Sequence, residues 1–72
     1  MIPIQLFQRV RLRRDLPDIG LRSGTQGRVV DLNPLDPIHV EVEFHIDDGS
    51  KHGRFLERIV PIESLEVLGP AS

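Results

Sequence analysis

Hydrophobic and polar residues alternate without a break in the segment IHVEVEFHI, residues 38–46. A period of two residues places successive side chains on opposite faces of a β-strand. The pattern therefore predicts a strand that is buried on one side only. The buried face is expected to carry Ile38, Val40, Val42, Phe44 and Ile46, and the solvated face His39, Glu41, Glu43 and His45.

A shorter alternation in residues 7–14, FQRVRLRR, predicts the first strand of the chain. Val10 and Leu12 share one face, and the other face carries Arg9, Arg11 and Arg13. Residues 26–32, QGRVVDL, predict a second strand, in which Gly27 marks either a crowded position or a bulge.

The C-terminal third predicts two further strands. Residues 54–60, RFLERIV, form the fourth strand, although their apolar positions do not alternate cleanly. The segment PIESL, residues 61–65, begins with proline and predicts a single 3₁₀ turn. Residues 66–68 predict a short fifth strand, and residues 69–72 predict a flexible tail.

Proline and glycine mark the connections between these strands. Residues 15–25 predict one long turn, shaped by Asp15, Pro17, Gly20 and Gly24. The segment NPLDP, residues 33–37, predicts a loop because its prolines exclude a helix or a central strand. Residues 47–53, DDGSKHG, predict a hairpin connection.

Five short strands connected in this way predict an all-β fold, a small five-stranded SH3-like barrel with one 3₁₀ turn before the last strand. We expect a single SH3-like domain over residues 1–72, with its core in residues 7–68. The first and last strands are neighbours in such a barrel, so Arg9, Arg11 and Arg13 are expected to face Glu63 and Glu66. Closure of the barrel also limits the exposure of strand edges.

The length of 72 residues leaves little room for an interior active site, because a domain of this size buries only about 60% of its unfolded surface. The absence of cysteine removes disulfides and thiolate metal sites. The N-terminus lacks the pattern of a signal peptide, and no stretch approaches the roughly 18 apolar residues of a membrane span. We therefore expect a soluble, cytoplasmic protein without contact to a membrane.

The net charge of −2 conceals an asymmetry along the chain. Residues 1–28 carry six arginines against two aspartates, which gives +4, and residues 29–72 carry three basic against nine acidic residues, which gives −6. A dedicated nucleic-acid binder is usually basic overall, because contacts to phosphate dominate its affinity. The asymmetry indicates instead that the two ends of the chain meet and pair their charges.

The glycine-rich first connection belongs to a longer pattern. It runs from Val10-Arg11-Leu12 through Asp15-Leu16-Pro17, Gly20-Leu21, Gly24, Gly27 and Val29-Val30 to Val42-Glu43-Phe44 and Leu65. On these residues the chain resembles, over roughly residues 7–68, a family of short bacterial proteins classified as a domain of unknown function, with the motif DLPxxGLxxGxxGxVV. The resemblance implies an SH3-like barrel and brings no catalytic residues. A looser similarity links the chain to KOW-type modules and to SH3-like accessory subunits of bacterial enzyme complexes, and it implies a fold and no function.

Two candidate ligand sites are weak when judged by their residues. A phosphate-binding loop needs Gly-Lys-Ser/Thr before a helix, and Gly20 and Gly24 have neither the lysine nor the helix. The histidines and glutamates of residues 39–45 alternate with apolar residues, and neighbours on this face are about 7 Å apart, so two adjacent members can share a metal but four cannot. The simpler interpretation is a solvated face paired with Arg28, Arg54 or Arg58. We expect no metal and no cofactor.

Other function classes lack the residues that they require. No nucleophile motif is present, and so small a barrel has no pocket that excludes water, so we expect no enzymatic activity. A groove for proline-rich peptides needs aromatic side chains, and the chain has three phenylalanines and neither tryptophan nor tyrosine. Binding of single-stranded nucleic acid also needs stacking aromatics beside basic residues.

The remaining class is a non-catalytic protein-interaction module, an accessory subunit or the small partner of a protein encoded beside it. Arg11, Arg13, Arg14 and Arg22 are the candidate contact residues, because arginine is favoured at interfaces. Intramolecular pairing with the acidic half of the chain is an equal alternative for them. A weak, KOW-like nucleic-acid contact through the arginine-rich first strand is the alternative function, and a homodimer is left open by the sequence.

Overall fold

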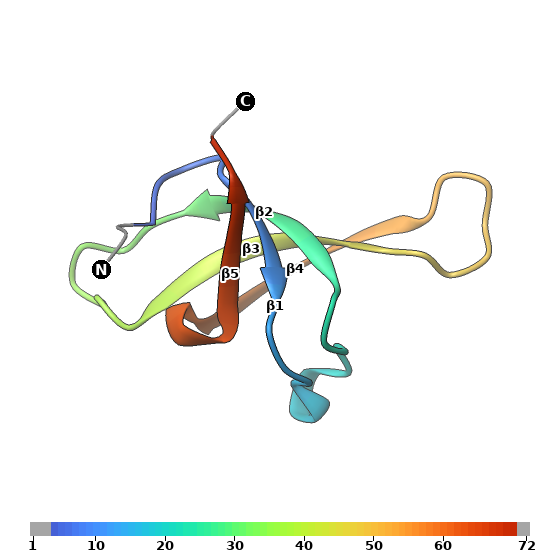
Figure 1. Ribbon diagram of the computed structural model, residues 1–72, viewed down its shortest axis with the longest axis horizontal. Helices are drawn as coiled ribbons and strands as arrows, with labels where there is room; N and C mark the ends of the chain where they lie inside the picture. Colours follow the sequence, from blue (N-terminus) through green and yellow to red (C-terminus); the bar gives the residue numbers. More distant parts are fainter. Residues whose placement is uncertain (1–3, 71–72) are drawn as a thin grey trace.

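The computed structural model describes residues 4–70, and Figure 1 shows the course of the chain. Its five strands are β1 (Arg9–Leu12), β2 (Gln26–Asp31), β3 (His39–Ile46), β4 (Arg54–Pro61) and β5 (Leu65–Gly69). Two 3₁₀ turns accompany them, η1 (Pro17–Ile19) in the first connection and η2 (Ile62–Ser64) before β5. The five predicted strands and the turn before the last strand are confirmed, and η1 is an addition that the sequence pattern does not predict. The predicted tail begins within β5, and residues 71–72 lie outside the described chain.

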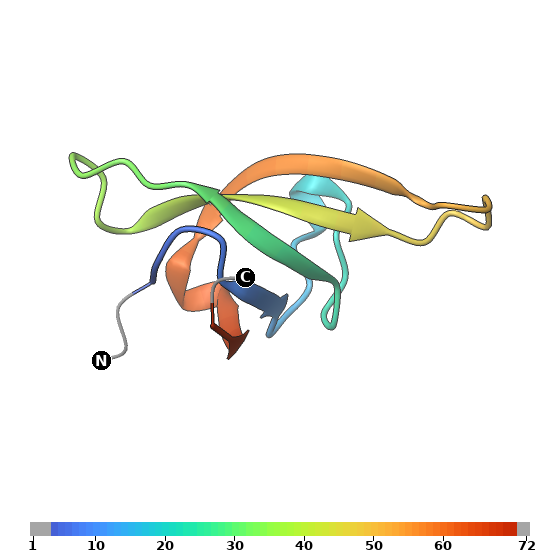
Figure 2. The same ribbon diagram turned by 90° about the horizontal axis from the view of Figure 1, so that it is seen from above.

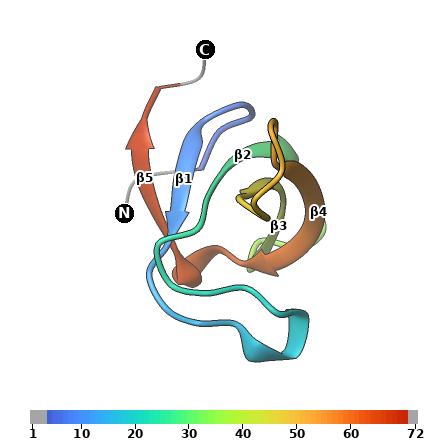
Figure 3. The same ribbon diagram turned by 90° about the vertical axis from the view of Figure 1, so that its right-hand side faces the viewer.

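All neighbouring strands are antiparallel, in the order β4-β3-β2-β1-β5. The first and last strands are neighbours, as predicted, because β1 lies between β2 and β5. β4 and β5 form the two edges, and no ladder joins them within residues 4–70. The all-β, five-stranded architecture is thus confirmed, and the sheet curls around its core with an open ladder (Figure 3).

β3 and β4 form one long hairpin, and its tip at residues 47–53 extends away from the rest of the chain (Figure 1). β1 and β5 lie on the other side of the core and cross this hairpin at a steep angle (Figure 2). β2 connects the two layers because it pairs with both β1 and β3. None of the helical turns in residues 4–70 has the length and apolar character needed to cross a membrane.

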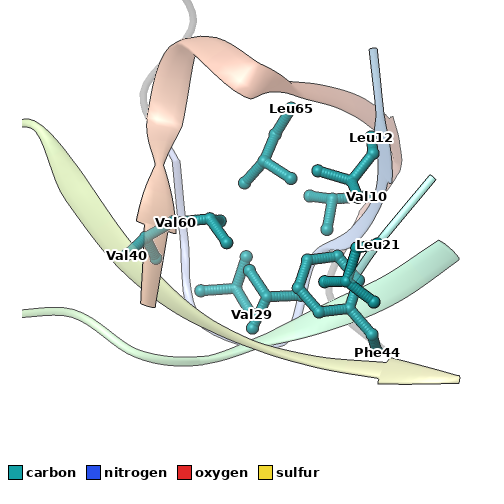
Figure 4. Packing of buried hydrophobic residues seen from close by; sticks show 9 residues of the cluster. Val10, Leu12, Leu21, Val29, Val40, Phe44, Val60 and Leu65 are labelled. Atoms are coloured by element: carbon teal, nitrogen blue, oxygen red, sulfur yellow. The ribbon is translucent and has the colours of Figure 1, made fainter. Parts of the chain in front are cut away.

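The core is aliphatic and contains one aromatic ring, that of Phe44 (Figure 4). Phe44 is fully buried, and burial of a side chain of this kind contributes about 1.5 to 3 kcal/mol. The alternation in β1 and β3 correctly predicts five of the buried positions. The buried hydrophobic residues are Val10, Leu12, Leu21, Val29, Val40, Val42, Phe44, Val60 and Leu65.

The two ends of the predicted apolar face of β3 differ from the expectation. Ile38 lies before the strand and is 62% exposed, and Ile46 is only half-buried. Ile46 still packs against the buried core, whereas Ile38 does not. The alternation continues beyond the part of the strand that faces the core.

The long first connection is itself ordered by a small hydrogen-bonded loop. Leu16 and Leu21 bridge each other, with N–H···O distances of 2.7 and 3.1 Å, and Leu21 enters the core. η1 lies between them, and Gly20 ends it with a φ of 71°, in the left-handed region that glycine adopts without strain. Pro17 therefore begins the turn and Gly20 ends it.

Gly27 lies where β2 approaches β3 most closely. A Cβ at this position would come within 2.6 Å of the carbonyl oxygen of Glu43 and within 2.7 Å of Cγ1 of Val42. The bulge of β2 falls later, between Val29 and Asp31. Of the two sequence readings of Gly27, the crowded position is the one that the structure shows.

Candidate functional site

The outer face of the sheet is divided by charge. Directly paired residues of an antiparallel ladder lie on the same face, so the register aligns Arg9, Arg28, Glu43 and Glu57 across β1, β2, β3 and β4. The β1–β2 side is basic and the β3–β4 side is acidic. The charge asymmetry of the sequence thus becomes a boundary on one surface.

Two of the four candidate arginines, Arg11 and Arg13, line one surface groove of about 420 Å³ together with Ser23 and Gly24 of the first connection. Arg11 forms an ion pair with Glu66, and Arg14 forms one with Glu63. Both pairs are exposed, and such pairs contribute at most about 1 kcal/mol each. Intramolecular pairing, the alternative reading, therefore applies to these two arginines.

Arg13 and Arg22 are exposed, and neither forms an ion pair with another residue of the described chain. Arg22 lies in the first connection, where its carbonyl oxygen accepts a hydrogen bond from Thr25 Oγ1 at 2.7 Å. Nearby, Asp15 Oδ1 accepts a hydrogen bond from the Ser23 N–H at 2.8 Å and fixes the base of this connection. Of the three first-strand arginines expected to face Glu63 and Glu66, only Arg11 does so.

Arg9 and Arg28 lie directly opposite each other on β1 and β2. No acidic group of residues 4–70 forms an ion pair with either of them. Together they line one side of a surface groove of about 280 Å³, whose other walls include Glu43, His45 and Phe55. The rings of His45 and Phe55 lie 5.2 Å apart between centroids, at an interplanar angle of 32°.

β4 presents a free edge. Ile62 and Ile38 form a hydrogen-bonded pair, because Ile62 donates its N–H to the carbonyl of Ile38 at 2.8 Å. Hydrogen-bonded and non-hydrogen-bonded pairs alternate along an antiparallel ladder, so every second residue of β4 directs its backbone groups away from β3. This alternation turns the backbone N–H and C=O of Phe55, Glu57 and Ile59 away from β3.

The side chains along this edge are unusually apolar for a surface. Phe55 is 63% exposed and Ile59 is 67% exposed, on the same face as Glu57. Arg58 donates from its guanidinium to the carbonyl oxygen of Glu57 at 2.7 Å and thereby occupies one acceptor of the edge. A second groove, of about 290 Å³, opens where β4 ends, between η1 and the segment 59–61.

Carboxylates gather beside this edge. The pKa of Glu41 is raised above its ordinary value, first because its carboxyl shares a hydrogen bond with Glu57, then because it loses contact with water, and further because the charges of Glu57 and Asp31 are close. The acidic side of the outer face is therefore short of positive charge.

The side chains on the predicted solvated face of β3 interact with different residues. His39 contacts Asp36 at 3.1 Å, Glu41 interacts with Glu57, and His45 packs against Phe55. Within residues 4–70 no group of three histidine, aspartate or glutamate residues is arranged to hold a metal ion. The basic partners expected from the sequence are Arg28, Arg54 and Arg58. In the described residues none of them forms an ion pair with this face of β3.

The fold and its surfaces define a small all-β chain whose candidate sites are open grooves and a free strand edge. The sequence profile of one family, Domain of unknown function (DUF4926), matches residues 6–51. The chain belongs to this family. The match contains β1, the long first connection, β2, β3 and most of the hairpin tip, whereas β4 and β5 lie beyond it. No curated protein and no solved structure matches the chain.

Proposed function

We propose that the chain is a non-catalytic protein-interaction module that binds an extended segment of a partner protein along the free edge of β4. The observation that supports this function best is the combination of unpaired backbone groups and exposed apolar side chains on one strand. An added strand would gain main-chain hydrogen bonds from residues 55, 57 and 59 and would cover the side chains of Phe55 and Ile59.

The charges beside this edge define the chemistry of the partner. Glu57 lies between Phe55 and Ile59 on the outer face and shares a hydrogen bond with Glu41, which in turn lies close to the charge of Asp31. A segment with a lysine or arginine opposite Glu57 and apolar residues on both sides complements this arrangement. The partner is therefore a strand with an apolar-basic-apolar alternation.

A second copy of the chain fits the edge less well. If two β4 strands paired antiparallel so that Phe55 of each met Ile59 of the other, the two Glu57 side chains would lie directly opposite each other. Like charges in that position are destabilising. Arg58 occupies the carbonyl oxygen of Glu57, so any strand that pairs with this edge, whether a partner's or a second copy's, must displace its guanidinium from that oxygen.

The groove beside η1 extends the surface beyond the end of β4. Leu16, Pro17 and Ile19 line it from the first connection, and Ile59 and Pro61 line it from β4. A strand that follows the edge of β4 would reach this groove, which has room for one apolar side chain of the partner. The first connection would then add specificity to the backbone pairing.

The test is the selection of extended peptides from a random library with the full chain, followed by amide hydrogen exchange of the complex. Selected peptides are expected to alternate apolar and basic residues and to protect the amides of Phe55, Glu57 and Ile59. Glu57→Lys should abolish binding and Ile59→Thr should weaken it. Leu35→Thr is the matched control, because Leu35 is 91% exposed and lines neither of the grooves that include Ile59. Selected peptides that leave the β4 amides unprotected, or that bind Glu57→Lys equally well, would contradict the proposal.

Two broader inferences accompany this function. An SH3-like architecture is supported by the long first connection, by the 3₁₀ turn before β5 and by the pairing of the first strand with the last. The resemblance to short bacterial proteins supports a bacterial, cytoplasmic protein. An accessory subunit of a larger complex is the form of interaction module that suits a chain with a free strand edge.

A further inference from the structure

We propose that the groove between Arg9, Arg28, His45 and Phe55 binds a nucleoside phosphate unit, either as a free nucleotide or within a single strand of nucleic acid. This site goes beyond the docking edge, because it is built on Arg9 and Arg28 of β1 and β2 and shares only Phe55 with that edge. The groove lies on the boundary between the basic and the acidic side of that face.

The two arginines supply the anion site. Like charges that lie directly opposite each other on neighbouring strands destabilise a sheet, and Arg9 and Arg28 lie opposite each other without an ion pair to another residue in the range 4–70. By contrast, Arg11 and Arg14 have glutamate partners. Glu43 lies opposite Arg28 on β3 but forms no ion pair with it in the described residues, so both guanidinium groups remain available to a ligand. Guanidinium groups bind phosphate through paired N–H donors.

The rings of His45 and Phe55 supply a stacking surface at the other side of the groove. Phe55 is 63% exposed, and its ring packs against that of His45, which orients both. A nucleobase can stack on such a surface whatever its identity, because every base has a π-face. Gln26 and Glu43 also line the groove and offer hydrogen-bonding groups to the edge of a base.

The size of the groove matches a single nucleotide unit. Its volume of about 280 Å³ lies just below the range of small-molecule sites, which begins at about 300 Å³, so it has room for a small ligand only. The groove is a surface feature, so the neighbouring nucleotides of a strand can continue past it. A phosphate bound by Arg9 and Arg28 would place the base of the same nucleotide at the rings of His45 and Phe55.

The experiment is a titration of the ¹⁵N-labelled full chain with AMP, inorganic phosphate, 3-phenylpropionate and a ten-nucleotide single-stranded thymidine oligonucleotide. AMP is expected to shift the amides of Arg28, His45 and Phe55 and to bind at least several-fold more tightly than phosphate or phenylpropionate. An oligonucleotide that binds more tightly than AMP, with an affinity that falls with salt, identifies a nucleic-acid strand as the source of the unit. Equal affinity identifies the free nucleotide. Equal binding of AMP and phosphate, or of AMP and phenylpropionate, would overturn the proposal, as would shifts outside the groove.

Variants separate this site from the docking edge. Arg9→Gln and Arg28→Gln should each weaken AMP binding several-fold, and Phe55→Leu, which keeps an apolar edge but removes the ring, should weaken it by about tenfold. Arg13→Gln is the matched control and should leave the affinity unchanged. Ile59→Thr should weaken peptide docking and leave AMP binding intact, so the failure of one proposal is distinguishable from the failure of the other.

Discussion

Arg11 of β1 and Glu66 of β5 are direct partners across the antiparallel ladder, and their side chains form an ion pair. The pair joins the basic N-terminal part of the chain to its acidic C-terminal part. Arg14 and Glu63 repeat the arrangement beyond the end of the ladder. The opposite charges of the two halves therefore stabilise the pairing of the first strand with the last.

Loss of this ion pair should lower stability slightly. Arg11→Gln is expected to reduce the free energy of unfolding by about 0.2 to 1 kcal/mol, because the pair is exposed and is screened by salt. The effect should disappear in about 1 M salt, where the screening length is about 3 Å. Urea denaturation at low and high salt measures it, and a loss that is independent of salt would show that the side chain acts through packing.

Arg9→Gln should have the opposite effect. It removes the repulsion between Arg9 and Arg28, which lie directly opposite each other, and cross-strand pairs of this kind change stability by about 0.2 to 1 kcal/mol. Arg9 has Gly69 opposite it on β5, whereas Arg28 also faces Glu43 on β3, so the change at Arg9 removes no favourable cross-strand charge pair. The variant should therefore unfold at a higher urea concentration than the wild type at low salt. A destabilised Arg9→Gln would mean that the guanidinium of Arg9 has a neutralising partner in the free chain.

Gly27→Ala should strongly destabilise the fold. The added Cβ would approach the carbonyl oxygen of Glu43 and a methyl group of Val42 at distances that real Cβ atoms do not show, so β2 and β3 must separate locally. We expect a loss of about 1 to 3 kcal/mol, the usual cost of overpacking. Gly69→Ala is the control, because nothing lies within 4 Å of its Cβ position, and thermal unfolding of the two variants compares them. Equal melting temperatures would contradict the crowding.

The sequence predicts the strands well because the core is built from alternating residues. The faces of β1 and β3 follow directly from Val10 and Leu12 and from the run that contains Val42 and Phe44. The bridge of Leu16 with Leu21 could not be predicted, because a period of two residues does not describe a closed loop. Local pattern reveals strands, and it does not reveal how a long connection folds on itself.

The candidate sites were harder to predict than the strands. Phe55 and Ile59 look like core residues by composition, and their spacing of four residues with Glu57 between them places all three on one face, opposite to that of Val60. That signal was present in the fourth strand, but only the pairing with β3 shows that this face is the outer one. The opposition of Arg9 and Arg28 likewise depends on register, which residues far apart in sequence determine together.

The carboxylates of β3 and β4 predict a dependence of stability on pH. The pKa of Glu41 in the folded chain is raised above its unfolded value, so its contribution to stability is fully present below the unfolded pKa and is lost as the pH rises through the folded pKa. Asp36 and Asp48 have lowered pKa values, so their contributions are present above the unfolded pKa and are lost as the pH falls through the folded pKa. Glu57→Gln should reduce the rise in the pKa of Glu41 and raise the melting temperature at pH 7 relative to the wild type. Carbon-detected NMR titration of Glu41 measures the change, and an unaltered pKa would remove Glu57 as its cause.

Self-association along β4 should depend on the same residues. In the free chain, Arg58 occupies the carbonyl oxygen of Glu57, and two copies of Glu57 would repel each other in the register that joins Phe55 to Ile59. Arg58→Ala combined with Glu57→Gln removes both obstacles, so this double variant should dimerise at concentrations at which the wild type sediments as a monomer. Sedimentation velocity at pH 7 measures the difference. Addition of Ile59→Thr should restore the monomer, because it removes apolar surface from the new contact, and a double variant that stays monomeric would show that the edge of β4 is protected by other means.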